Sequence, residues 1–191
     1  MSLRRFTIEE LPVTTWKNGG GATREIVSWP PYAEPDAFDW RVSIATIAAS
    51  GPFSTFPGID RTIMLLDGDG VRLQSAGFDH LLDTPHQPFS FDGEAPVDCS
   101  LLGGTSTDFN LMVRRGQGRA EVRILEDVME LDISEHGLLL SIEGQWRVGG
   151  GVLKQGQGVW WTEQEETWQV KPASRGARLA VVQWRSVREE F

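Results

Sequence analysis

Residues 16–25 bring together more chemically useful side chains than any other stretch of this chain. The segment reads Trp-Lys-Asn-Gly-Gly-Gly-Ala-Thr-Arg-Glu, so an ammonium, an amide, a hydroxyl, a guanidinium and a carboxylate surround three consecutive glycines. Glycine has no Cβ, which lets the backbone turn sharply and approach another surface. We therefore expect a polar cluster at the rim of a rigid framework. The alternative is a tight hairpin turn with ordinary surface charges.

Two further segments alternate polar and apolar residues with the period of a β-strand. In residues 40–45, Arg41, Ser43 and Ala45 share one face, opposite three apolar side chains. A small face with one long cation favours a cavity wall over a packed core. In residues 108–114, Asp108 and Asn110 share a polar face in the same way. The alternative for both segments is an antiparallel sheet with one face in water.

A rigid loop leads into another arginine. Residues 50–61 contain two prolines, two glycines and two phenylalanines, which hold the loop in shape. Such a loop costs little entropy to order on binding, so it can present Ser54 and Arg61 in fixed positions. Arg61 is suited to bidentate binding of a carboxylate. The alternative is that Asp60 neutralises it.

The composition limits the class of protein. The chain has 191 residues and a formal net charge of −9, which argues against nucleic acid as a partner because phosphate backbones repel acidic surfaces. No apolar run reaches the roughly 20 residues of a membrane helix, and the N-terminus lacks the apolar core of a signal peptide. Cys99 is the single cysteine and is expected to be a buried, inert thiol. We expect a cytoplasmic protein.

Short apolar runs separated by turn residues predict an all-β fold. Segments 61–66 and 71–73 flank Asp-Gly-Asp-Gly, and segments 137–142 and 146–148 flank Glu-Gly-Gln, so two hairpins are predicted. The same order of strands follows each predicted hairpin, at an offset of roughly 70–76 residues, which is too long for a solenoid unit. The pattern favours an internal duplication into two β-barrel or sandwich halves.

The motifs of metal and nucleotide chemistry are missing. The three histidines, His80, His86 and His136, form no His-x-His pair, so we expect no metal site and no cofactor. The chain has no nucleophile elbow and no Walker loop. Glu25 and Asp108 remain candidates for a general base, should the fold bring them together.

The blocks at 16–26, 40–45, 51–61 and 108–112 resemble, in order, the motifs of the HutD/Ves family. The resemblance implies a bicupin, with two cupin-like β-barrel or jelly-roll halves: residues 1–115, carrying the pocket, and residues 116–191, sharing one core. It implies no cupin metal motif. Its HutD branch is linked to histidine utilization as a regulatory or ligand-sensing accessory, and the resemblance does not choose between this branch and the Ves-like one.

These observations predict a metal-independent protein that binds a small carboxylate, and the resemblance implies an intermediate of histidine utilization such as N-formylglutamate or urocanate. The side chains expected at the site are Trp16, Lys17, Asn18, Glu25, Arg41, Ser43, Phe53, Phe56, Arg61, Asp108 and Asn110. The competing hypothesis is a metal-independent lyase, isomerase or hydrolase with Glu25 or Asp108 as general base. A third is a structural or protein-interaction module. The small carboxylate is the expected partner, nucleic acid and membrane are not, and a homodimer is left open.

Overall fold

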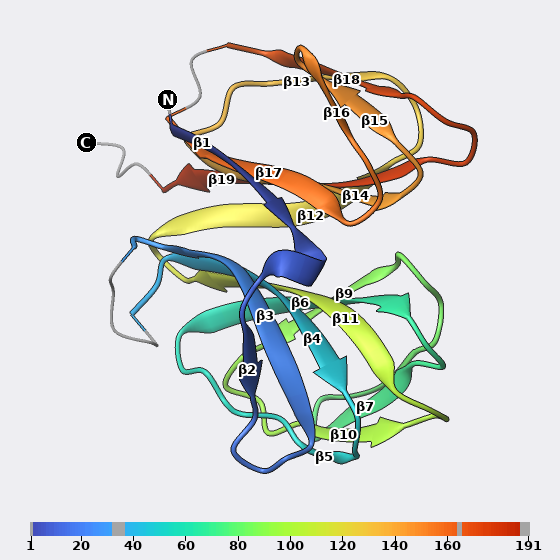
Figure 1. Cartoon of the computed structure of the whole chain (residues 1–191). Helices are drawn as coiled ribbons and strands as arrows, with labels where there is room; N and C mark the ends of the chain where they lie inside the picture. Colours follow the sequence, from blue (N-terminus) through green and yellow to red (C-terminus); the bar gives the residue numbers. More distant parts are fainter. Residues whose placement is uncertain (1, 32–36, 164–165, 188–191) are drawn as a thin grey trace. The chain divides into compact units, whose positions relative to one another are not determined.

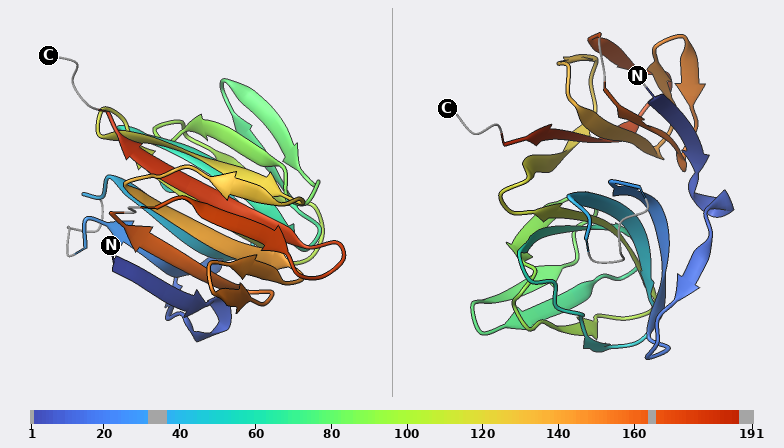
Figure 2. Two further views of the ribbon diagram at one scale, coloured as in Figure 1. Left: turned by 90° about the horizontal axis from the view of Figure 1, so that it is seen from above. Right: turned by 90° about the vertical axis from the view of Figure 1, so that its left-hand side faces the viewer.

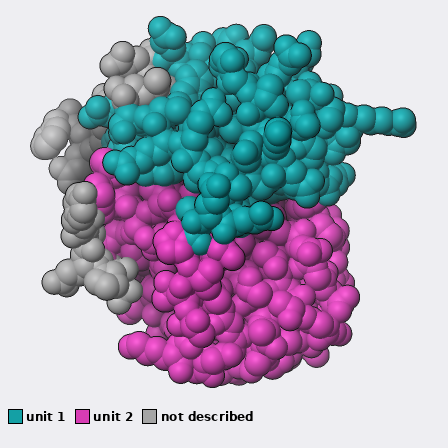
Figure 3. Space-filling view, in the orientation of Figure 1, with its two compact units in different colours: residues 1–11, 118–191 teal, residues 12–117 magenta. Residues whose placement is uncertain are grey.

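The structure is a computed structural model that describes residues 2–31, 37–163 and 166–187. It divides into two compact units, residues 12–117 and residues 1–11 with 118–191 (Figures 1 and 3). Its described residues contain β-strands and one 3-10 turn, Ile8–Glu10, and no α-helix. The all-β prediction is confirmed. No helix in the described residues is long and apolar enough to cross a membrane.

The unit of residues 12–117 contains a six-stranded and a four-stranded antiparallel sheet. The larger has the order β2-β3-β4-β11-β6-β9, with bounds Val13–Thr15, Gly21–Trp29, Trp40–Ile47, Ser106–Arg114, Ile59–Asp67 and Pro88–Asp92. The smaller has the order β5-β10-β7-β8, with bounds Gly51–Pro52, Asp98–Leu101, Val71–Ser75 and Phe78–Leu82. A core cluster joins them, with Ile63 and Leu65 from the larger sheet against Leu73 and Cys99 from the smaller.

The other unit is built in the same way. Its five-stranded sheet has the order β1-β17-β14-β19-β12, with bounds Ser2–Thr7, Gln157–Thr162, His136–Glu143, Arg178–Ser186 and Gly118–Leu125. Its four-stranded sheet has the order β13-β18-β15-β16, with bounds Met129–Leu131, Trp168–Pro172, Trp146–Val148 and Gly151–Leu153. The two further views of Figure 2 allow these strands to be followed. Trp146, Trp161 and Leu179 lie in its core.

Strand order therefore recurs along the chain. The series β4-β11-β6-β9 in the first unit matches β12-β19-β14-β17 in the second, and β5-β10-β7-β8 matches β13-β18-β15-β16. The bounds of the units are not those of the predicted halves, and residues 116 and 117 group with the first unit. Residues 1–11 group with the C-terminal residues, because β1 pairs along its length with β17.

The two predicted hairpins are wrong. Segment 61–66 belongs to β6 and segment 71–73 to β7, and these strands lie in different sheets of the unit. The same holds for β14 and β15 in the other unit. Each Gly-containing turn carries the chain from one sheet to the other. The strands before and after the turn then face each other, and their apolar sides pack into one core. In each of these regions the hairpin lies one strand later, at β7–β8 and at β15–β16.

The first strands of the N-terminal unit explain the run of three glycines. Gly19 has a φ of 73°, and Gly21 begins β3 so close to β4 that a Cβ would collide with the carbonyl oxygen of Thr46 and the ring of Trp16. Glycine at position 21 is therefore required by the approach of two backbones.

Replacing Gly21 should separate these strands. We expect Gly21→Ala to lower the free energy of unfolding by about 1–3 kcal/mol, the usual cost of an overpacked site. Urea unfolding of the full chain measures this effect. Gly51→Ala is the control, because a Cβ at Gly51 would meet nothing within 4 Å. Equal losses in the free energy of unfolding of Gly21→Ala and Gly51→Ala would contradict the requirement for glycine at position 21.

Candidate functional site

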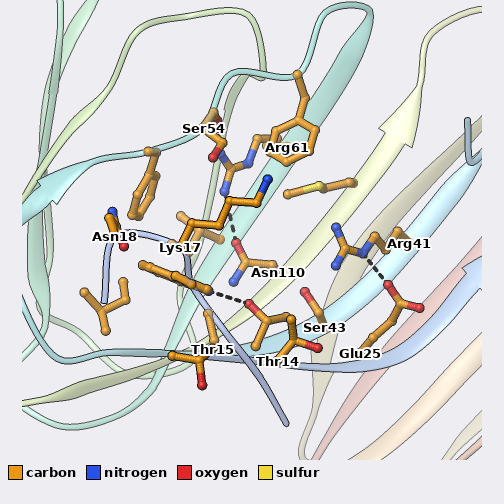
Figure 4. A pocket seen from close by; sticks show the side chains of 18 of the residues that line it. Thr14, Thr15, Lys17, Asn18, Glu25, Arg41, Ser43, Ser54, Arg61 and Asn110 are labelled. Carbon is orange, nitrogen blue, oxygen red and sulfur yellow. Dashed lines mark hydrogen bonds and ion pairs between the residues drawn. The ribbon is translucent and has the colours of Figure 1, made fainter. Parts of the chain in front are cut away.

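A cavity of about 780 Å³ lies on the inner face of the six-stranded sheet of the N-terminal unit (Figure 4). Its lining comes from β2 and the turn after it, from β3, β4, β6 and β11, and from the rigid loop after β5. Segments far apart in the sequence thus supply one continuous wall.

The turn between β2 and β3 forms one edge of the cavity. The Asn18 Oδ1 atom accepts a hydrogen bond from the Gly20 N–H at 2.9 Å, and the Trp16 indole donates to the Thr23 hydroxyl at 2.8 Å. These bonds hold the turn, and Trp16, Lys17 and Asn18 line the cavity from it. The segment is therefore a hairpin turn, and its polar side chains nevertheless form part of the site.

Arg61 is the central charged group. The residue is 7% exposed, and the carbon of its guanidinium lies 5.2, 5.5 and 5.0 Å from the ring centroids of Phe53, Phe56 and Phe91. Aromatic faces attract a cation, but they do not neutralise it. Burial, with a smaller contribution from the positive charge of Arg41, lowers the pKa of Arg61 to about 10, so the group is still cationic at neutral pH.

The hydrogen bonds of Arg61 are weak and neutral. Its Nη1 atom donates to the carbonyl oxygen of Ser54 at 3.3 Å and its Nη2 atom to the Asn110 Oδ1 atom at 3.4 Å, while its Nε–H has no partner. Within the described ranges it forms no ion pair. Asp60, the neighbour considered as its counter-ion, pairs instead with Arg115 at 2.7 Å. A buried cation in this state is costly unless something supplies the missing negative charge.

A second arginine lies on the opposite part of the wall. The Nε atom of Arg41 donates to the Glu25 Oε2 atom at 2.8 Å, and both side chains line the cavity. Ser43, on the same strand as Arg41 and the register partner of Glu25, lines it as well. In Figure 4 the terminal guanidinium nitrogens of Arg41 point away from Glu25. This pair offers both a cationic and an anionic group to a ligand.

The strand alternation inferred from the sequence places most of the expected residues correctly on this wall. Every side chain expected at the site lines the cavity except Asp108. Ala45 and Ser54, which the sequence placed on the expected cavity wall and on the rigid loop, line the cavity too. Strand parity alone could have indicated several of the remaining lining residues, which were not among the expected ones: Pro12, Thr14, Thr15, Thr23, Ile47, Pro52, Ile63 and Met112. Thr14 and Thr15 could not be assigned to a face from the sequence, because β2 has only three residues and shows no alternation.

Asp108 lies deeper, among the core of the unit. It is fully buried on β11, its Oδ1 atom accepts a hydrogen bond from the Ser106 hydroxyl at 3.2 Å, and its Oδ2 atom has no partner. Burial raises the pKa of Asp108 to about 7. Glu25, by contrast, is half-exposed at the cavity wall. The structure therefore does not bring the two candidate bases together in the cavity.

The histidines are scattered over both units. His80 stacks on Phe89 with ring centroids 3.8 Å apart, and His136 lies beside Trp184 with centroids 5.0 Å apart. Among residues 2–31, 37–163 and 166–187, no three His, Cys, Asp or Glu side chains form a group that could hold a metal ion. Cys99 is buried, and burial raises the pKa of its thiol to about 12, as expected for an inert cysteine.

The second unit fills the corresponding space. The β6–β11 pair of the first unit and the β14–β19 pair of the second each contain one bulge, and the two pairs can be aligned at it. In this alignment Gly137 on β14 occupies the position of Arg61 on β6. Trp161 pairs with Gly137 as Phe91 pairs with Arg61, and the Trp161 ring occupies the space that a Cβ of Gly137 would need. An indole thus replaces the guanidinium and its cavity.

The fold and the cavity define an all-β, cupin-like protein with an arginine-centred pocket. A family model described as HutD matches residues 8–180, and the chain belongs to this HutD/Ves family. Protein Ves of Cronobacter sakazakii is 42% identical over 164 residues, covering 85% of this chain and 88% of that protein. Protein Ves of Escherichia fergusonii is 38% identical over 181 residues, covering 94% and 93%.

Solved structures agree with this assignment. HutD from Pseudomonas fluorescens superposes with a TM-score of 0.87 and 27% identity, covering 98% of this chain and all of that one. Protein Ylba from E. coli has a TM-score of 0.74 at 10% identity, covering 99% and 93%, and shows the fold alone.

The buried carboxyl of Asp108 should make stability depend on pH. Its pKa is about 7 in the folded chain against an ordinary value of 3.8, so folding favours the protonated form, and the free energy of unfolding falls as pH rises from 4 to 7. The pKa of Asp108 in the folded chain lies about three units above its ordinary value, which corresponds to a loss in the free energy of unfolding of at most about 4 kcal/mol.

We expect Asp108→Asn to flatten that slope, because the amide cannot ionise. Urea unfolding at several pH values measures it, and Asp98→Asn on an exposed position of β10 is the matched control. An unchanged slope in Asp108→Asn would contradict the raised pKa.

Proposed function

We propose that this chain is a bicupin whose N-terminal unit binds a small carboxylate without a metal, as a regulatory or sensing accessory of histidine utilization. The observation that supports this most directly is Arg61, a buried guanidinium with weak neutral partners that faces a cavity of about 780 Å³. A ligand carboxylate would supply the missing charge and accept two parallel hydrogen bonds from the guanidinium.

Other groups of the cavity suit the rest of such a ligand. Arg41 can bind a second carboxylate group, Lys17 adds a third cation at the edge, and Asn110 and Ser43 offer orienting hydrogen bonds. The aromatic rings around Arg61 exclude water, which strengthens an ionic contact. N-formylglutamate and urocanate, the intermediates that the family resemblance suggests, both carry carboxylates and are the natural first candidates.

The runner-up is a metal-independent lyase, isomerase or hydrolase. Glu25 is its better-placed general base, because it lines the cavity, whereas Asp108 does not. One observation still favours chemistry at Asp108: its pKa of about 7 is the value expected of a general base at neutral pH. Turnover of a pathway carboxylate that is lost in Glu25→Gln or Asp108→Asn would favour this alternative. The third hypothesis, a purely structural module, is less well supported because the unit contains a cavity.

Binding can be tested with a thermal-shift screen of N-formylglutamate and urocanate, with and without EDTA. A ligand at 100 times its dissociation constant adds about 2.7 kcal/mol of stability, which gives a readable shift. We expect a shift with one of these compounds that EDTA leaves unchanged. A shift that EDTA abolishes would contradict metal-independent binding.

Substitution of Arg61 separates binding from folding. We expect Arg61→Met to abolish the ligand-induced shift while leaving the ligand-free protein at least as stable as wild type, because an uncompensated buried charge is replaced by an apolar chain of similar length. Arg72→Met is the control, since Arg72 is a half-exposed arginine of the same unit that pairs with Asp79. Ligand stabilisation that survives in Arg61→Met would contradict the proposal.

A further inference from the structure

The C-terminal unit contains a second hollow with a concentration of arginines. It has a volume of about 580 Å³ and lies along β12 and β19, where Arg119, Arg123 and Arg185 line it. The sequence alone would assign Arg119 and Arg123 to a solvated basic run. The strand register instead places them on one face with Arg185.

This hollow overlaps, along β12 and β19, one edge of the place in the fold that the carboxylate cavity occupies in the other unit. By strand register, Gln183 corresponds to Met112, Glu121 to Arg41 and Arg123 to Ser43. Those three counterparts all line the N-terminal cavity. Trp161 has filled the Arg61 position, so the space that remains is displaced toward β12 and carries its own charges.

Two of the three arginines of the hollow are held by neutral groups. The Arg123 Nη2 atom donates to the Gln183 Oε1 atom at 2.7 Å, and the Arg185 Nη2 atom to the carbonyl oxygen of Ile133 at 3.2 Å. The Gln183 amide is oriented in turn, because its Nε2 atom donates to the Asp132 carbonyl oxygen at 2.7 Å. These contacts fix two guanidiniums without neutralising them.

Like charges also face each other across the strands. Arg119 and Arg185 are direct register partners on antiparallel strands, an arrangement that costs stability when nothing lies between the charges. Glu121 and Asp132 line the hollow as well, yet none of its three arginines forms an ion pair within the part of the chain that the structure describes. The carboxylates of Glu121 and Asp132 therefore remain available to accept hydrogen bonds from hydroxyl groups of a ligand.

We propose that this hollow is a second anion site that binds a phosphorylated small molecule, with the phosphate between Arg119 and Arg185. A phosphate carries up to two negative charges and three terminal oxygens, so it can satisfy two guanidinium forks at once, whereas a single carboxylate matches one. Arg123 faces the body of the ligand, and Glu121 accepts from its hydroxyl groups. The proposal is independent of the carboxylate cavity.

Isothermal titration calorimetry of the full chain with pyrophosphate, at constant ionic strength, tests this site. We expect saturable binding that weakens at least tenfold in Arg119→Gln and in Arg185→Gln. Binding should be unchanged in Arg147→Gln, an exposed arginine of the same unit outside the hollow, and in Arg61→Gln. All of the substituted residues of the hollow lie near the surface, so folding should persist.

Four outcomes would overturn the proposal. Wild-type protein without saturable binding would exclude the site. Equal weakening in Arg147→Gln would reduce the effect to general electrostatics, and loss of binding in Arg61→Gln would place the probe in the N-terminal cavity. Tighter binding of citrate than of pyrophosphate, under the same conditions, would contradict the assignment to phosphate.

Discussion

The candidate site of the N-terminal unit depends on an unusual arrangement: a guanidinium buried among three phenylalanine rings, with no carboxylate among the described residues to neutralise it. Arg61 makes two long hydrogen bonds to neutral oxygens and leaves its Nε–H without a partner. The surrounding acids are used elsewhere, since Asp60 and Asp92 both bind Arg115 and Glu25 binds Arg41. A buried, uncompensated cation costs stability, which supports the proposal that a ligand supplies the missing negative charge.

The duplicated strand order shows how one framework can hold different sites. Each unit carries a large and a small sheet with matching order, and each has a hollow on the inner face of the large sheet. Exchanging Arg61 and Phe91 for Gly137 and Trp161 converts an open, charged wall into a packed one. Register is preserved because a one-residue slip would turn every side chain to the other face.

Strand parity made much of the site predictable. The alternation around Arg41 and in the strand of Asn110 assigned their faces correctly, because the side-chain period of a strand is two. Asp108 shares the face of Asn110, but strand parity shows only which face a residue is on. Whether that position opens into the cavity or is covered by the second sheet cannot be read from parity. The turn at Asp67-Gly68 was misread as a hairpin for a similar reason: a local turn signal does not tell whether the following strand stays in its sheet or crosses to the other.

The most direct test of this account is a crystal structure of the protein with bound urocanate or N-formylglutamate, beside one without ligand. The account predicts a ligand carboxylate within hydrogen-bonding distance of the Arg61 guanidinium, between the rings of Phe53 and Phe56, and no protein carboxylate there in the ligand-free crystal. A side-chain carboxylate paired with Arg61, or a ligand bound away from it, would contradict the central claim.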